Sequence, residues 1–184
     1  MKLNIIHLPH RTDRMDLLLE QLRHQGITDY SIWNGIIDTK ITARGISQAH
    51  KQIVQFAKEN QLPEVLISED DLKFTSKGAF EFFIKNKPGD FDLYLASIYF
   101  GEISQDNKVE DFSGLTFYII SRKFYEVFLN VPEHDNIDRL LKKRGKYIVS
   151  NPFTVIQHNG FSDNVKTYCN YDEFLTNRRL YFKP

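Results

Sequence analysis

Short apolar runs alternate with amphipathic segments along most of the chain, and this order constrains the fold more than any other feature. The apolar runs, which predict strands, lie at 2–8, 30–33, 64–68, 91–96, 115–120, 147–149 and 153–157. The segments with apolar residues every three or four positions, which predict helices, lie at 15–25, 46–60, 76–85, 122–129 and 136–143. Strands that alternate with helices form mainly parallel sheets with helices on both faces. We therefore expect an α/β fold with a Rossmann-type, mainly parallel sheet.

The length of the chain favours one domain over two. A chain of 184 residues with 41% hydrophobic residues can bury a substantial core. We therefore expect a single domain over 1–184, with a polar loop at 101–113. From about residue 162 the sequence has no clear period, and we expect the segment at about 165–184 to be a tail packed on the domain.

Charge and cysteine content point to a cytoplasmic protein without a nucleic-acid partner. Lysine plus arginine equals aspartate plus glutamate at 24 each, so no overall field attracts nucleic acid. The single cysteine, Cys169, cannot form an intramolecular disulfide, and Met1 is not followed by an apolar leader. No apolar run approaches the roughly 20 residues that span a bilayer, so we expect any membrane contact to be peripheral, at the inner face. The sequence does not indicate an oligomeric state.

Three adjacent acids, Glu69, Asp70 and Asp71, follow the apolar run at 64–68. Open α/β sheets bind ligands beyond the carboxyl ends of their strands. Adjacent carboxylates repel one another, and a divalent cation that prefers oxygen ligands stabilises them. If the strand continues through the acids, Glu69 and Asp71 project to one side and Asp70 to the other. Glu69 and Asp71 are then the predicted pair, although a solvated strand end or a helix cap remains an alternative for the triplet alone.

Two other segments carry candidate ligand-binding residues. Arg11 and Arg14 flank Asp13 where the first helix begins, and both arginine and a helix N-terminus favour phosphate. The alternative is that Asp13 complements the helix dipole and the arginines are solvated. His50 lies one turn into the second helix, close to Gly45, which allows close backbone approach. A packing role is the alternative for His50.

His158 is a candidate metal ligand from the C-terminal part of the chain. It follows the predicted strand at 153–157 and precedes an Asn-Gly turn. An imidazole beside carboxylates favours manganese over magnesium or calcium. Without the acids, His158 would be a loop histidine. For the other four histidines we expect structural roles; they are His7, His10, His24 and His134.

Taken in chain order, these segments resemble glycosyltransferase family 25, the lipopolysaccharide and collagen galactosyltransferase family. The blocks that carry the resemblance are IHLPHRTDR at 6–14, Asn34-Gly35, GISQAH at 45–50, LISEDDLKF at 66–74, FYIISR at 117–122, Ile137-Asp138, 152–157 and 162–164. Two features depart from the family. Ile46 and Ala49 replace the cysteine and serine of its central glycine motif, and the loop at 101–113 is shorter.

The resemblance implies a GT-A-like fold and a metal-dependent hexosyltransferase that acts with inversion. It implies that Asp71 binds Mn²⁺ or Mg²⁺, that Glu69 or Asp70 holds the ribose or a metal-bound water, and that His158 completes the metal shell. The donor would be a nucleotide diphosphate sugar, UDP-galactose by family analogy, in a pocket lined by Arg11, Asp13, Arg14 and His50. The acceptor would be a hydroxyl of a lipopolysaccharide or surface glycan.

An inverting transfer also needs a base to take the proton of the acceptor hydroxyl. Asp138 is the first candidate and Asp135 the second. The alternative for both is an acid that stabilises a helix N-terminus. Two other functions remain open at this stage. One is a nucleotide-sugar or glycan-binding protein that has lost turnover, and the other is a metal-dependent phosphotransfer or nuclease domain. A nuclease or phosphotransfer domain would need a basic face, and the only obvious basic cluster in the sequence is at 142–144.

Overall fold

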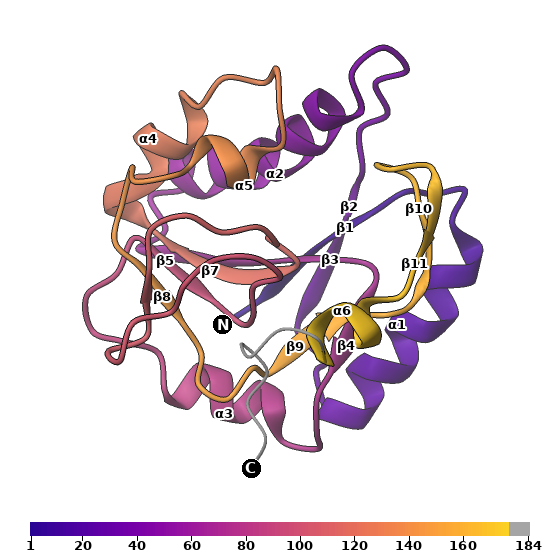
Figure 1. Cartoon of the computed structure of the whole chain (residues 1–184), viewed down its shortest axis with the longest axis horizontal. Coiled ribbons are helices and arrows are strands. Elements are labelled where there is room, and N and C mark those ends of the chain that lie inside the picture. The colour runs from indigo at the N-terminus through magenta and orange to yellow at the C-terminus, as the bar shows by residue number, and fades with distance from the viewer. Residues whose placement is uncertain (177–184) are drawn as a thin grey trace.

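A seven-stranded sheet crosses the centre of the molecule in a computed structural model that describes residues 1–176 (Figure 1). The strand order is β2-β1-β3-β7-β5-β8-β6. The strands are β1 Leu3–His7, β2 Tyr30–Asn34, β3 Glu64–Glu69, β5 Leu93–Leu95, β6 Lys108–Val109, β7 Phe117–Ser121 and β8 Tyr147–Val149. β2, β1, β3, β5 and β8 run in one direction, whereas β7 and β6 run against their neighbours. The predicted α/β fold with a mainly parallel sheet is therefore confirmed.

Helices cover both faces of this sheet (Figure 1). They are α1 Thr12–Gln25, α2 Thr42–Glu59, α3 Ala79–Lys85, the 3-10 helix η1 Arg122–Phe124, α4 Tyr125–Leu129, α5 Ile137–Leu140 and α6 Tyr171–Thr176. α1 and α3 pack on one face, and α2, α4 and α5 pack on the other.

The central strands are apolar on both sides because each face of the sheet is buried. In β3, Val65 and Ile67 join the core under α2, whereas Leu66 joins the core under α1 and α3. All three are at most 3% exposed. Burial of each such side chain contributes about 1.5–3 kcal/mol. The alternation also fixes which side each acid at the end of β3 faces.

α2 begins at Thr42, four residues before the predicted start, because Asp38 stabilises the chain just before the helix. The Asp38 Oδ1 accepts the N–H groups of Lys40 and Ile41 at 2.8 and 2.9 Å. Gly45 lets the preceding loop lie directly on the helix, since a Cβ at Gly45 would come within 2.4 Å of the Ile36 carbonyl oxygen. The expected close backbone approach at Gly45 is confirmed.

The segment after residue 159 is more ordered than predicted. It forms a hairpin of β10 Gly160–Ser162 and β11 Thr167–Cys169, followed by α6. The Asn159 Oδ1 accepts the first N–H groups of α6, from Tyr171 at 2.7 Å and Asp172 at 3.2 Å. The expected tail at about 165–184 thus includes β11 and α6 up to residue 176, and 177–184 lie outside the described residues.

Two short strands outside the central sheet bring the segment at 155–157 next to the three acids. β4 Leu72–Phe74 pairs antiparallel with β9 Val155–Gln157 directly after the acids. β6 lies in the expected polar loop at 101–113. Within residues 1–176, no helix is both long and apolar enough to cross a membrane.

Candidate active site

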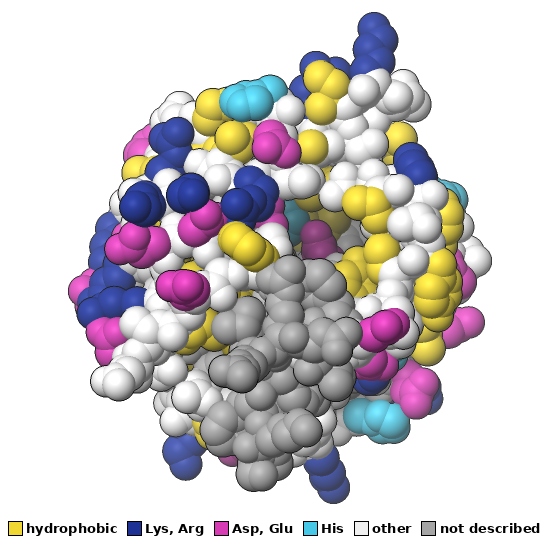
Figure 2. All heavy atoms as spheres, in the orientation of Figure 1, with side chains coloured by type: hydrophobic (Ala, Val, Ile, Leu, Met, Phe, Trp, Pro, Cys, Tyr) yellow, Lys and Arg dark blue, Asp and Glu magenta, His cyan; other side chains and the backbone are white. Residues whose placement is uncertain are grey.

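A cavity of about 890 Å³ lies at the carboxyl ends of β1, β2 and β3. Its walls come from the β1–α1 connection, the loop at 35–41, α2, the acidic turn, residues 113–116, α5 and the β10–β11 hairpin. Figure 2 shows it as a hollow near the middle of the molecule, with acidic and histidine side chains in its depth and hydrophobic ones beside it. Its volume lies in the range of about 300–1,000 Å³ typical of small-molecule sites.

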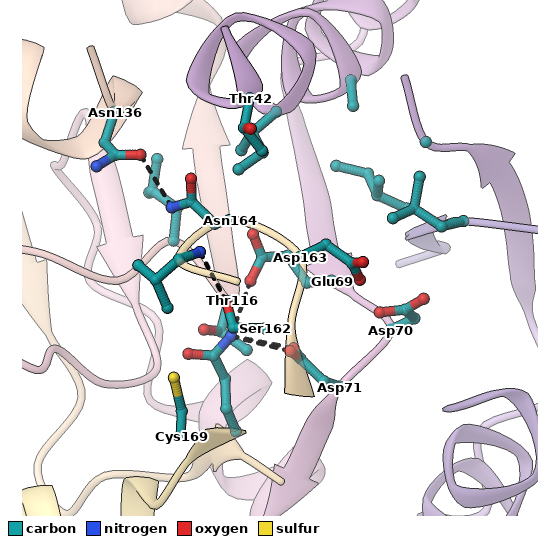
Figure 3. A pocket seen from close by; sticks show the side chains of 18 of the residues that line it. Thr42, Glu69, Asp70, Asp71, Thr116, Asn136, Ser162, Asp163, Asn164 and Cys169 are labelled. Carbon is teal, nitrogen blue, oxygen red and sulfur yellow. Dashed lines mark hydrogen bonds between the residues drawn. The ribbon is translucent and has the colours of Figure 1, made fainter. Parts of the chain in front are cut away.

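The three acids divide between the two sides of the strand end as predicted. The Gln157 side-chain amide donates to Glu69 Oε2 at 3.2 Å and to the Asp71 Oδ1 and Oδ2 atoms at 3.1 and 3.2 Å. Asp70 instead bonds to residues of β1 and α1. Glu69 and Asp71 are thus a pair that shares one amide donor inside the cavity (Figure 3).

The carboxyl of Asp71 is held in an environment that opposes its charge. Burial and the nearby charge of Glu69 raise the pKa of Asp71 to about 7, although the Arg14 guanidinium acts in the opposite direction. Asp71 is only 8% exposed. A cation that entered the cavity would favour the ionised form of Asp71, because an opposite charge nearby stabilises a carboxylate.

Asp70 uses both carboxylate oxygens to hold its surroundings. His7 Nδ1 lies 2.7 Å from Asp70 Oδ2, and Arg14 Nη1 donates to Asp70 Oδ1 at 2.8 Å. Arg14 Nη1 also lies 3.1 Å from Asp71 Oδ2. Asp70, which lines the cavity, thereby orients Arg14 toward it. In this structure Asp70 therefore positions Arg14, whereas the sequence suggested a ligand of the ribose.

Arg11 and Asp13 do not line this cavity, in contrast to Arg14. They line a small cavity of about 40 Å³ beside it, together with Arg14, Asp70, Asp71 and His158. Arg11 donates to both carboxylate oxygens of Asp13, to Asp163 Oδ2 at 2.5 Å and to the Phe161 carbonyl oxygen at 3.1 Å. Its donors therefore bind the β10–β11 hairpin to the start of α1. The expectation that Arg11 and Asp13 line the nucleotide pocket stays a prediction: they are absent from the wall of the large cavity, and Arg11 bonds to Asp13 and to the hairpin, which the sequence did not reveal.

His50 is a buried link between the sheet and Glu69. Its Nδ1 lies 2.9 Å from the Tyr118 hydroxyl and its Nε2 lies 3.4 Å from Glu69 Oε1. A carboxylate can only accept, so Nε2 carries a hydrogen; in the neutral imidazole the Tyr118 hydroxyl then donates to Nδ1. His50 is 1% exposed and lines the cavity. It is placed to orient Glu69, whereas the sequence suggested contact with the donor.

The structure places His158 next to the acids through its backbone: its N–H donates to the Asp71 carbonyl oxygen at 2.7 Å, and His158, Asp70 and Asp71 line the small cavity together. Within the described residues, no three His, Cys, Asp or Glu side chains form a group that could hold a metal ion. Desolvation and the charge of Lys73 lower the pKa of His158, and its Nε2 is buried without a hydrogen-bond partner in the described part of the chain. Successive side chains of a strand point to opposite faces, and Gln157 lines the large cavity, whereas His158 lines the small one. The expected shell of Asp71, Glu69 and His158 is not assembled among the described residues, and Gln157 is the residue at the two acids that was missed.

Asp138 lies in the cavity wall and Asp135 does not. The Asp138 Oδ2 accepts the N–H of Gly114 at 2.8 Å, and its Oδ1 accepts the N–H of Arg139 at 2.8 Å. Burial raises the pKa of Asp138 despite these two bonds, and the charge of Glu69 raises it further. Asp135 is exposed. Of the two predicted bases, the structure leaves only Asp138 in reach of a ligand in the cavity.

The β10–β11 hairpin closes one side of the cavity. Its turn residue Asn164 donates from Nδ2 to the Asn136 Oδ1 at 3.1 Å, which joins the hairpin to the start of α5 (Figure 3). Ser162 and Cys169, on the inner face of the hairpin, line the cavity. The hairpin is thus bonded at its turn to α5 and, through Arg11 and Arg14, to the start of α1.

Comparison with known proteins supports the fold. No protein-family model matches the sequence, and no curated protein is significantly similar to it. The chain resembles the crystal structure of A197 from STIV, with a TM-score of 0.56 and 12% identity over 91% of this chain and 93% of that one. It is also similar to HddC from Yersinia pseudotuberculosis complexed with GMP-PN, with a TM-score of 0.43, 15% identity and coverage of 85% and 93%. A second HddC structure gives 0.45 and 16%, with coverage of 82% and 69%. At these identities only the fold of A197 bears on this chain.

Proposed function

We propose that this chain is a glycosyltransferase that moves a hexose from a nucleotide diphosphate sugar to a hydroxyl of a surface glycan, with inversion, as in glycosyltransferase family 25. One observation carries the proposal. The sequence blocks that resemble the family are far apart in the chain, yet each of those at 6–14, 45–50, 66–74, 137–138 and 162–164 contributes to the wall of one cavity. A single ligand-sized space shared by these blocks supports the view that they form one site.

Glu69 and Asp71 fit a metal ion whose remaining ligands come from the substrate. They face one amide group, and burial and repulsion from Glu69 raise the pKa of Asp71. Mg²⁺ sites commonly use one or two carboxylates, with waters and substrate phosphates as the remaining ligands. The described residues offer no third carboxylate, imidazole or thiolate ligand, so they do not form a closed protein site. A bound Mg²⁺ or Mn²⁺ ion would supply Lewis-acid stabilisation of the departing diphosphate.

Arg14 and Asp138 provide the other two groups that the transfer needs. Arg14 lines the cavity 3.1 Å from Asp71, where its charge can offset that of a diphosphate. The acceptor oxygen would form a bond to the anomeric carbon while the bond from that carbon to the diphosphate oxygen breaks. The proton of the acceptor hydroxyl would pass to the carboxylate of Asp138. A raised pKa suits this carboxylate to act as a base near neutral pH.

The proposal is tested by incubating the full chain with a panel of nucleotide diphosphate sugars, starting from UDP-galactose, with Mn²⁺ and glycan acceptors. We expect acceptor-dependent release of nucleoside diphosphate. Asp138→Asn should lower kcat by at least ~100-fold and leave donor binding intact, because only proton transfer is lost. Asp135→Asn is the matched control on the same segment and should turn over like the wild type.

Equal turnover by Asp138→Asn would remove Asp138 as the base. Donor binding without any release would instead favour a binding protein that has lost turnover.

A further inference from the structure

Two loops at the mouth of the cavity expose apolar side chains to solvent. In the loop at 35–41, Ile36 is 37% exposed and Ile37 is 63% exposed. In the turn of the β10–β11 hairpin, Val165 is 58% exposed. All three residues also line the cavity, so they lie at its opening. Exposed apolar side chains that gather at one place, and are not scattered singly, mark an interaction surface.

The charge of the same two loops is positive at the surface. Each loop has one acid, and each acid is paired with an arginine, Asp38 with Arg44 and Asp163 with Arg11. Lys40 and Lys166 are exposed in these loops. Among the ion pairs of the described residues, neither lysine takes part in one. Apolar side chains beside free cations are the chemistry that anionic lipid surfaces bind.

Both loops are held in place before any partner arrives. The loop at 35–41 is fixed by the bonds of Asp38 to the start of α2 and by its close contact with Gly45. The hairpin is fixed by Arg11 and by the bond between Asn164 and Asn136. Flexible loops lose conformational entropy when they bind, and loops that are already ordered do not carry this cost.

The outer face of the hairpin extends this apolar surface. Phe161 and Tyr168 are directly opposite in the β10–β11 register and are 48% and 68% exposed. Tyrosine combines an apolar ring with a polar hydroxyl, which suits the boundary between lipid and water. Ser162 and Cys169 of the same hairpin face the cavity, so one element both closes the site and presents an apolar surface.

We propose that this rim, made of Ile36, Ile37, Lys40, Val165 and Lys166, docks on the surface of a bilayer that contains anionic phospholipid. The chain as a whole has no net charge, so attraction to lipid is local to the rim. Docking in this orientation turns the mouth of the cavity toward the bilayer and toward acceptors anchored in it. Membrane binding does not depend on transfer activity, so the two proposals can fail separately.

The test is co-sedimentation of the full chain with phosphatidylcholine vesicles and with vesicles that also contain phosphatidylglycerol. We expect binding only to the anionic vesicles, with an affinity that falls about fivefold for each of Lys40→Gln and Lys166→Gln. Val165→Asp should lower the affinity at least about tenfold, because it places a negative charge where an apolar contact forms. Val127→Asp is the matched control, since Val127 is 38% exposed on α4, away from the rim.

Circular dichroism and thermal melting of each variant verify that it is folded. The proposal is overturned if the wild type does not prefer anionic vesicles, or if Val165→Asp and Val127→Asp weaken binding equally. Self-association in sedimentation velocity that Val165→Asp abolishes, without any vesicle binding, would identify the rim as a protein interface instead.

Discussion

Replacing Asp71 with asparagine should stabilise the protein while removing its function. The Asp71 carboxyl is 8% exposed, and burial and the charge of Glu69 raise its pKa from 3.8 to about 7. Its ionised form is therefore disfavoured in the folded state relative to the unfolded state. Asparagine has the same shape as the neutral acid and removes the ionisation altogether. Ligand-binding sites commonly keep such unfavourable groups at the expense of stability.

The pH dependence follows from the direction of this change. Below about pH 4, Asp71 is protonated in both states and the substitution has little effect. As the pH rises from 3.8 to 7, the unfolded state loses its proton first, so the wild type loses stability relative to Asp71→Asn. The difference between 3.8 and about 7 corresponds to roughly 4 kcal/mol at ~1.4 kcal/mol per pH unit. If the Glu69 side chain moves away from Asp71, their repulsion and therefore this figure become smaller. We expect Asp71→Asn to raise the free energy of unfolding by about 1–4 kcal/mol at pH 8.

Thermal melting of both proteins between pH 4 and pH 8 measures the effect. For a chain of this length, 1 kcal/mol shifts the Tm by about 2–4 °C. Asp70→Asn is the control at the adjacent position and should have the opposite sign. It weakens buried bonds to His7 and Arg14 and should cost roughly 3 kcal/mol. A lower Tm for Asp71→Asn at pH 8, or a shift independent of pH, would refute the reasoning.

Three further substitutions test other parts of the site. Gln157→Leu removes the amide shared by Glu69 and Asp71 and should lower the free energy of unfolding by about 1–3 kcal/mol at pH 8 in urea titrations, with a smaller loss at pH 5. Gly45→Ala places a methyl group 2.4 Å from the Ile36 carbonyl oxygen, so it should displace the loop at 35–41 and weaken donor binding in calorimetry. Arg11→Gln should speed hydrogen exchange in the β10–β11 hairpin without changing exchange in β3, because it removes the bonds to Phe161 and Asp163 and leaves the bond from Arg14 to Phe161.

The parts of the fold that could be predicted are those determined by local pattern. β3 is an apolar run buried on both sides, and its alternation correctly places Glu69 and Asp71 opposite Asp70. Gly45 was correctly linked to close backbone approach because only the missing side chain matters there. By contrast, strands of two or three residues such as β6, β10 and β11 are too short to show a period in the sequence.

The parts of the site that could not be predicted depend on contacts between distant segments. Gln157 and His158 are neighbours, and only the pairing of Gln157 with Leu72 decides which of the two faces the acids. Arg11 and Arg14 both lie at the start of α1 and both bond to the hairpin, but Arg14 also bonds to Asp70 and lines the large cavity. Each case concerns which of two nearby side chains faces the large cavity. That choice is fixed by tertiary packing and not by residue type.

Isothermal titration calorimetry of the full chain with nucleotide diphosphate sugars tests the central claim most directly. With Mn²⁺ present, we predict one binding site for at least one such sugar. We expect the affinity to fall at least about tenfold when Mn²⁺ is removed, because one or two carboxylates and the diphosphate would share the ion. The same loss is expected for Asp71→Asn, measured at pH 8, where Asp71 is ionised in the wild type. Absence of binding across the panel, or equal affinity for the wild type and Asp71→Asn with and without Mn²⁺, would contradict a donor site built on Glu69 and Asp71.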